Sequence, residues 1–161
     1  MCQICKGNFS SSLTKLDCSN CQYVDVLPLL PKLTILNCSG CTSLTMIPVL
    51  PKLTTLNCGG CVSLSKVPLL PKLSTLYCSD CTNLSEIPAL PKLTKLYCSG
   101  CVSVTEIPML PKLKYLECSE CTSLTEIPEF SELTELDCYG CTNITEIPFF
   151  PKLKYLNSVE I

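Results

Sequence analysis

Apolar and polar positions recur along this chain with a period of 20 residues. The segment 31–50, PKLTILNCSGCTSLTMIPVL, returns in register five times up to residue 150, and residues 151–161 repeat its beginning. A unit of this length cannot bury its apolar residues alone, so neighbouring copies must stack to cover them. The pattern therefore predicts a solenoid.

The pattern inside one copy predicts the course of a coil. Alternation around Leu36 and Cys38 is typical of a short strand with both side chains facing inward. Two small residues follow, which predicts a tight turn that brings Cys41 back toward the interior. The two prolines of residues 47–51 forbid a helix and favour extended or polyproline-II backbone. We therefore expect a β-rich solenoid with parallel strands on one side and extended, polyproline-like return segments on the other.

The same register predicts one domain, 1–161, of about eight coils. Residues 1–17 form an irregular first coil, 18–150 carry the regular repeats, and 151–161 form a terminal partial repeat. Solenoids normally need polar caps. Either the last strand is the cap, or the chain is part of a longer array, or two molecules associate end to end.

The repeat, written LxxLxCxxCxxLxxIPxLP, resembles the leucine-rich repeat, in which a strand and a return segment line a horseshoe. Its short proline-containing return is similar to repeats of bacterial effectors, the run at residues 39–44 resembles repeats of plant immune receptors, and cysteine-containing arrays of this kind occur in giant DNA viruses. The resemblance implies a curved scaffold that binds proteins on its concave strand face.

The amino-acid composition excludes several classes of function. The chain has 12 Lys, 14 Asp plus Glu, a net charge of −2, and no Arg or His. Nucleic-acid binders rely on basic patches, so no nucleic-acid partner is expected. Without His, a histidine-assisted nucleophile and any histidine metal ligand are excluded, and we expect no enzyme.

The chain also predicts a location. No apolar run approaches the roughly 18 residues that cross a bilayer, so no membrane partner is expected. Cys2 and Cys5 follow Met1 at once and leave no recognisable secretory signal. This favours the cytoplasm or another reducing intracellular compartment.

Outward positions of the strands vary while the core positions do not, as expected of a binding face. Tyr is favoured at interfaces because it offers a large rigid surface with a polar tip. The alternative is that aromatic pairs across strands cover an exposed sheet. We predict a protein partner, of unknown identity, on the candidate contact residues Ile35, Tyr77, Tyr97, Tyr115, Tyr139, Tyr155, Glu117 and Glu135.

Cysteines occur only in Cys-x-x-Cys pairs, one in each copy. The pairs are Cys2 and Cys5, Cys18 and Cys21, Cys38 and Cys41, Cys58 and Cys61, Cys78 and Cys81, Cys98 and Cys101, Cys118 and Cys121, and Cys138 and Cys141. One interpretation is packing, because free Cys is a small hydrophobe that is commonly buried; no cofactor is then needed.

Two other roles for these pairs stay open. Thiolates from stacked pairs suit tetrahedral zinc or an iron–sulfur cluster, which would make the chain a metal store or an electron carrier. Disulfides, within a pair or between coils, are the third interpretation, disfavoured in a reducing compartment.

Overall fold

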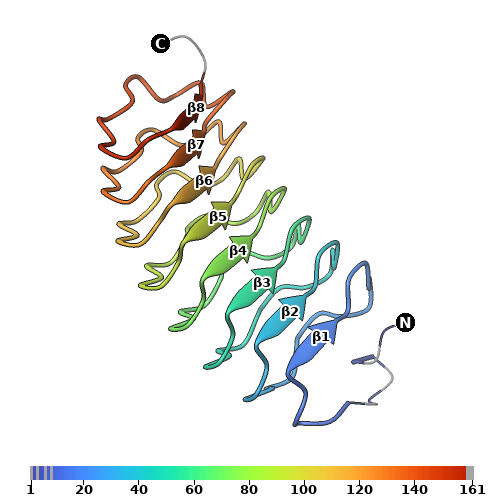
Figure 1. The fold of residues 1–161 in the computed structure, drawn as a ribbon. Coiled ribbons are helices and arrows are strands. Elements are labelled where there is room, and N and C mark those ends of the chain that lie inside the picture. Colours follow the sequence, from blue (N-terminus) through green and yellow to red (C-terminus); the bar gives the residue numbers. More distant parts are fainter. Residues whose placement is uncertain (1, 3, 6, 8, 159–161) are drawn as a thin grey trace.

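The computed structural model describes residues 2, 4, 5, 7 and 9–158. Its strands form one 8-stranded parallel sheet in chain order, each paired with the next (Figure 1). The strands are β1 (Lys15–Asp17), β2 (Ile35–Asn37), β3 (Thr55–Asn57), β4 (Thr75–Tyr77), β5 (Lys95–Tyr97), β6 (Tyr115–Glu117), β7 (Glu135–Asp137) and β8 (Tyr155–Asn157). The predicted β-rich solenoid is confirmed.

The sequence period sets the register of this sheet. Leu36 pairs with Leu56, 20 residues further along the chain. The other residues of β1 to β7 pair with the same offset. Each strand has 3 residues, but hydrogen bonding between coils continues past it, since the Cys38 N–H donates to the Asn57 carbonyl at 2.8 Å. Neighbouring coils are thus joined along both the strand and the turn that follows it.

The core runs through the middle of the stacked coils. In the coil of β2, the buried residues are Leu33, Leu36, Cys38, Cys41, Leu44, Ile47 and Leu50, and the interior coils repeat this set. Among the described residues, no polar or charged residue is buried. Fully burying one leucine side chain contributes about 1.5–3 kcal/mol, so the stacking of apolar columns is the main source of stability.

A tight turn in each regular coil, from the pair of Cys18 and Cys21 onward, carries the Cys-x-x-Cys pair. Its third residue has a left-handed backbone, with φ of 67° at Gly40 and 58° at Glu120. Glycine reaches this conformation without steric cost, whereas a residue with a Cβ is strained there. The turn directs both cysteines inward, as the sequence predicts.

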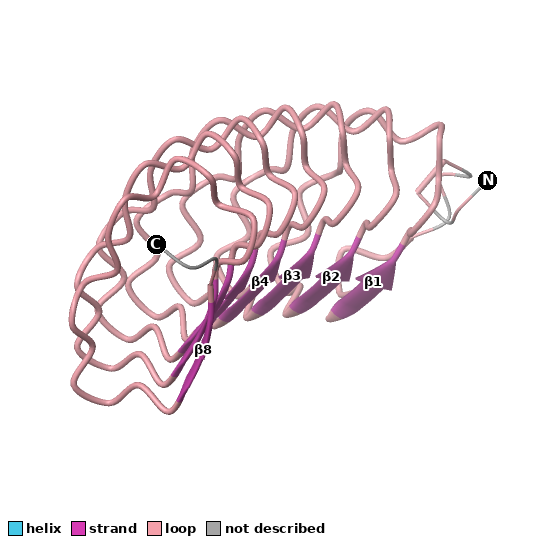
Figure 2. Cartoon of the chain, turned by 90° about the horizontal axis from the view of Figure 1, so that it is seen from above, coloured by secondary structure: helices cyan, strands magenta, loops and turns pink. Residues whose placement is uncertain are grey.

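The return side of each coil is extended. Isolated bridges, such as Val26 with Met46, join some of these segments, and the described chain contains no helix. Figure 2 shows the coils following a bend, with the strands along its inner side. Within the described residues there is no helix with the length and apolar character needed to cross a membrane.

Candidate functional site

Three tyrosines form a continuous aromatic ladder across β4, β5 and β6. The rings of Tyr77 and Tyr97 are stacked, with centroids 4.5 Å apart and an interplanar angle of 16°. The ring of Tyr115 follows at 4.7 Å from Tyr97, tilted by 35°. Tyr77 and Tyr97 pair in register on neighbouring strands, whereas Tyr115 reaches Tyr97 diagonally from the first position of β6. We call Tyr77, Tyr97 and Tyr115 the tyrosine ladder.

Carboxylates surround the C-terminal half of the tyrosine ladder. Glu117 pairs in register with Tyr97, and Glu135 with Tyr115. The Tyr115 hydroxyl donates to Glu117 Oε2 at 3.2 Å, and the Ser99 hydroxyl donates to Oε1 at 3.1 Å. Both carboxylate oxygens of Glu117 are therefore held in place beside the rings.

The same carboxylates affect how the ladder titrates. Partial burial and the nearby Glu117 raise the pKa of Tyr115 to about 12. Partial burial, Tyr77 and Glu117 also raise the pKa of Tyr97. Both phenols therefore stay neutral over the physiological range and offer hydroxyl donors rather than phenolates.

An acidic hollow lies beside the tyrosine ladder, at the turns that follow β4, β5 and β6. It has a volume of about 340 Å³. Its lining residues are Asp80, Ser99, Gly100, Glu117, Ser119 and Glu120. It carries three carboxylates and no basic side chain, so it suits an ammonium or guanidinium group.

The other predicted contact residues lie outside the ring stack, although Tyr155 pairs in register with Glu135 and the Tyr139 carbonyl accepts the Glu120 N–H at 2.7 Å. Tyr139 is exposed in the turn after β7, Tyr155 is exposed in β8, and Ile35 is half-buried in β2. Within the described part of the chain, neither Tyr139 nor Tyr155 stacks on another ring. The structure thus brings together three of the five predicted tyrosines with Glu117 and Glu135.

An exposed apolar stripe on the return side was not anticipated. It follows the variable position of the Pro-x-Leu-Pro segment, and its most exposed members are Leu29, Val49, Leu69, Met109 and Phe149, the last with 82% of its surface exposed. The signal in the sequence is that this position is apolar in every copy except at Glu129. Beside the stripe, a hollow of about 360 Å³ includes Met46, Val49 and Val67.

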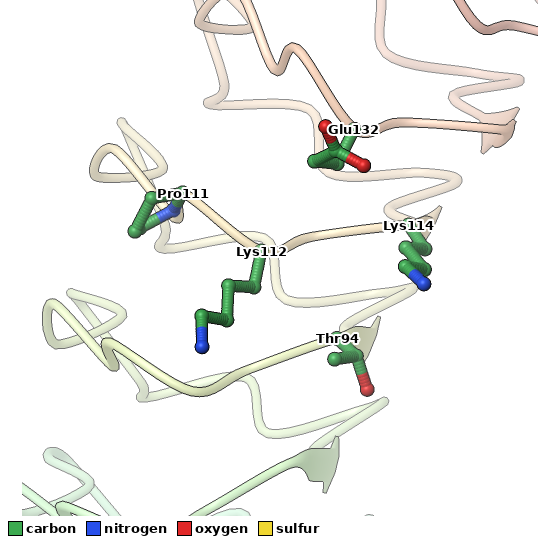
Figure 3. Close-up of a pocket in the computed structure, with 5 residues that line it drawn as sticks. All are labelled: Thr94, Pro111, Lys112, Lys114 and Glu132. Atoms are coloured by element: carbon green, nitrogen blue, oxygen red, sulfur yellow. The ribbon is translucent and has the colours of Figure 1, made fainter.

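A third hollow lies along the edge where the strands begin (Figure 3). It has a volume of about 420 Å³ and is lined by Thr94, Pro111, Lys112, Lys114 and Glu132. Figure 3 shows both lysine side chains extending toward the coil of Thr94, whereas Glu132 lies on the next coil, where it accepts from Lys152 Nζ at 2.6 Å. The hollow can attract an anion, but it offers no nucleophile beside a base.

The cysteine pairs of the regular repeats form a ladder of thiol-to-carbonyl hydrogen bonds. The second thiol of one pair donates to the carbonyl of the first cysteine in the preceding coil. Cys61 donates to Cys38 and Cys81 to Cys58, each at 3.0 Å. The bond recurs from Cys41 to Cys141 at 2.9–3.1 Å. These cysteines are therefore hydrogen-bonded core residues.

The first cysteine of each interior pair is a poor nucleophile. The pKa values of Cys58, Cys78, Cys98 and Cys118 are raised well above the ordinary value. The largest cause is the contact with the thiol of the second cysteine of the next coil's pair. Burial adds to the rise, because it disfavours the charged thiolate. Protonated thiols of this kind neither attack disulfides nor bind metals readily.

The sulfurs of the first coil are arranged differently. Cys2 Sγ lies 3.7 Å from Cys5 Sγ, which lies 3.4 Å from Cys21 Sγ. Cys21 is buried, whereas Cys2 and Cys5 are half-buried. Burial opposes ionisation of Cys21, but the backbone N–H groups of Cys2 and Tyr23 and the neighbouring thiols lower its pKa to about 6. Burial and Cys21 raise the pKa of Cys5 to about 11.

Only part of the predicted cysteine ladder brings sulfurs together as a metal site would. Within the described residues, Cys2, Cys5 and Cys21 are the one group of three or more Cys, Asp or Glu whose ligand atoms all lie within 4.8 Å of one another. All sixteen cysteines carry free thiols.

Comparison with protein-family models, with curated proteins and with solved structures found no match. What the tyrosine ladder and the sulfur cluster can bind is therefore inferred from their geometry and charge.

Proposed function

We propose that the protein is a non-enzymatic interaction scaffold of the leucine-rich-repeat type that binds a protein partner on its concave strand face. The observation that carries the proposal is the tyrosine ladder. Its rings offer a rigid, half-exposed aromatic surface that loses little conformational entropy on binding. Buried, well-packed Tyr residues are among the side chains that most often dominate binding energy.

The charges around the ladder favour a basic partner segment. Glu117 and Glu135 lie next to the rings of Tyr97 and Tyr115, and the acidic hollow adds Asp80 and Glu120. An Arg or Lys side chain can stack on a tyrosine face while its charged group pairs with a carboxylate. Aromatic surface and negative charge together therefore select an extended segment with alternating basic and apolar residues.

The chemistry of the chain supports a role without catalysis, in a reducing compartment. The sequence has no His, and the cysteines are free thiols. In the described core, burial and thiol contacts raise the pKa of the first cysteine of the interior pairs, and the second cysteine donates to a main-chain carbonyl. Both features suit packing rather than reaction.

Selection from a displayed peptide library on the immobilised full-length protein tests the proposal. We expect enriched peptides to carry Lys or Arg next to apolar residues. Replacing Tyr97 or Tyr115 by Ala should weaken the affinity for the selected peptides by about 30-fold or more. This is the effect of losing an interface residue that contributes about 2 kcal/mol to binding. Titration calorimetry measures the change.

Tyr23→Ala is the matched control, because Tyr23 is exposed in the coil of β1, away from the ladder and the acidic hollow. It should leave the affinity within about twofold, while raised salt should weaken binding because the contacts are charged. Equal affinities of the Tyr97→Ala, Tyr23→Ala and wild-type proteins would place the binding surface elsewhere. Enrichment of acidic peptides would also contradict the assignment.

A further inference from the structure

The sulfur cluster of the first coil has the geometry of a thiolate metal site. In a tetrahedral zinc site with Zn–S bonds of about 2.3 Å, neighbouring sulfurs lie about 3.8 Å apart. The observed separations are 3.7 Å between Cys2 and Cys5 and 3.4 Å between Cys5 and Cys21. Small side-chain rotations would bring the three sulfurs to the vertices of such a site.

The regular coils show why this cluster is distinct. There, the second thiol of each pair donates a hydrogen bond to a buried carbonyl, as Cys41 does to the carbonyl of Cys18 at 3.0 Å. Within the described contacts, Cys21 makes no such bond and faces the sulfur of Cys5 instead. Its sulfur is therefore available to a ligand, whereas those of the regular coils are engaged.

Accessibility also favours the first coil. The cysteines from Cys38 to Cys121 are 0% exposed, so a metal ion has no route to them without opening the core. Cys2 and Cys5 are half-buried and reach solvent, and Cys21 closes the cluster from the core side. A metal ion can therefore enter and leave the site without unfolding a coil.

We propose that Cys2, Cys5 and Cys21 form a three-thiolate site for a thiophilic d¹⁰ cation, Zn²⁺ under cellular conditions. All three sulfurs bind as thiolates, so the protons still held by the cluster are released on binding, and each sulfur forms one bond to the metal. Soft thiolate ligands select zinc over magnesium or calcium. Three protein ligands leave one tetrahedral position for water or a small ligand.

The fourth nearby cysteine does not complete the site. Cys18 is buried, and burial is the first cause of the strong rise in its pKa. Its carbonyl accepts the thiol of Cys41, which ties it to the regular ladder. Binding at the three-thiolate site joins Cys2 and Cys5 to the coil of β1 through Cys21, so the metal also fastens this end of the solenoid.

Titration of the full-length, fully reduced protein with Zn²⁺, and with Cd²⁺ as a spectroscopic probe, tests the site. We expect one ion per chain, a thiolate-to-cadmium charge-transfer band, and release of protons on binding. Cys5→Ser should weaken Zn²⁺ binding by about 100-fold or more, since loss even of an outer-shell partner costs about 10–100-fold. Cys2→Ser should weaken it similarly, and both replace half-buried side chains.

Cys138→Ser is the matched control, because Cys138 belongs to a pair at the other end of the ladder. It should bind one ion with unchanged affinity. Failure of the reduced protein to bind Zn²⁺ or Cd²⁺, or equal affinities of the Cys5→Ser and wild-type proteins, would overturn the site. Binding of several ions per chain, lost in Cys138→Ser, would also overturn it by assigning the metal to the regular ladder. Peptide binding at the tyrosine ladder is measured separately, so either proposal can fail alone.

Discussion

At the scale of single residues, one backbone position decides the shape of each turn. The third residue of the Cys-x-x-Cys segment has a left-handed φ in every regular coil, and Gly, Asn, Asp and Glu all occur there. Gly60 shows the requirement most cleanly. A Cβ built on it meets nothing closer than 3.7 Å, so only its φ of 70° opposes a side chain.

We therefore predict that Gly60→Ala lowers the free energy of unfolding by about 1 kcal/mol, because left-handed strain of about 1–2 kcal/mol outweighs the gain from a less flexible unfolded chain. Gly59→Ala is the matched control, since Gly59 has no left-handed φ and its Cβ would meet the Ser79 carbonyl at an ordinary 3.4 Å. It should be neutral or slightly stabilising. Urea denaturation measures both, and equal effects would show that φ does not set the cost.

The core columns follow directly from the sequence, because period and alternation determine which residues face inward. Leu36 and Cys38 could be placed this way. The tyrosine ladder could be placed only in part. Tyr77 and Tyr97 share one column, but the diagonal contact of Tyr115 depends on side-chain direction between two columns, which the repeat pattern does not determine.

At the scale of the coil, the thiols connect each turn to its neighbour. The Cys58 carbonyl accepts the Cys61 N–H at 3.1 Å within its turn and the Cys81 thiol at 3.0 Å from the next coil. Both lone pairs of a buried carbonyl are thus used. The sequence places these cysteines inward, but it does not show this bond, because the acceptor is a main-chain atom with no sequence signature.

The two cysteine columns should respond differently to serine. Cys81→Ser keeps a donor near the Cys58 carbonyl, so we expect a loss of about 1 kcal/mol in the free energy of unfolding. Cys78→Ser places a hydroxyl where the thiol contacts the Cys101 thiol, and burying it without a good acceptor costs about 1–3 kcal/mol. Chemical denaturation should rank Cys78→Ser as the more damaging change. The reverse order would mean that the carbonyl bond does not stabilise the coil.

At the scale of the whole molecule, stacking gives the solenoid two unlike surfaces. The strand side carries the tyrosine ladder and its carboxylates, whereas the return side carries the apolar stripe ending at Phe149. The sequence indicated the first surface through its variable strand positions. The apolar character of the position between the two prolines is visible in the sequence, but the repeat pattern does not show whether an apolar side chain there is buried or exposed.

Stacking also couples the buried thiols to global stability. Cys58, Cys78, Cys98 and Cys118 have pKa values far above the ordinary 9.0, because each contacts a second-column thiol and is buried. They stay protonated in the folded chain, whereas the unfolded chain loses these protons above about pH 9. The unfolded state then binds fewer protons than the folded state, so stability falls as pH rises. Below the unfolded pKa this contribution is fully present.

We predict that the free energy of unfolding falls between about pH 8 and about pH 9.5, by about 0.8 kcal/mol for each thiol that stays protonated in the folded chain. This window lies below the unfolded pKa of Tyr and Lys, of about 10 and 10.4, so cysteine dominates the change. Cys78→Ala removes one such thiol and should make the fall smaller by about 0.8 kcal/mol, although it also lowers stability at neutral pH. Urea midpoints measured across the window under reductant give the slope. The same fall with pH in Cys78→Ala and in the wild-type protein would show that the Cys78 thiol does not keep its proton in the folded chain.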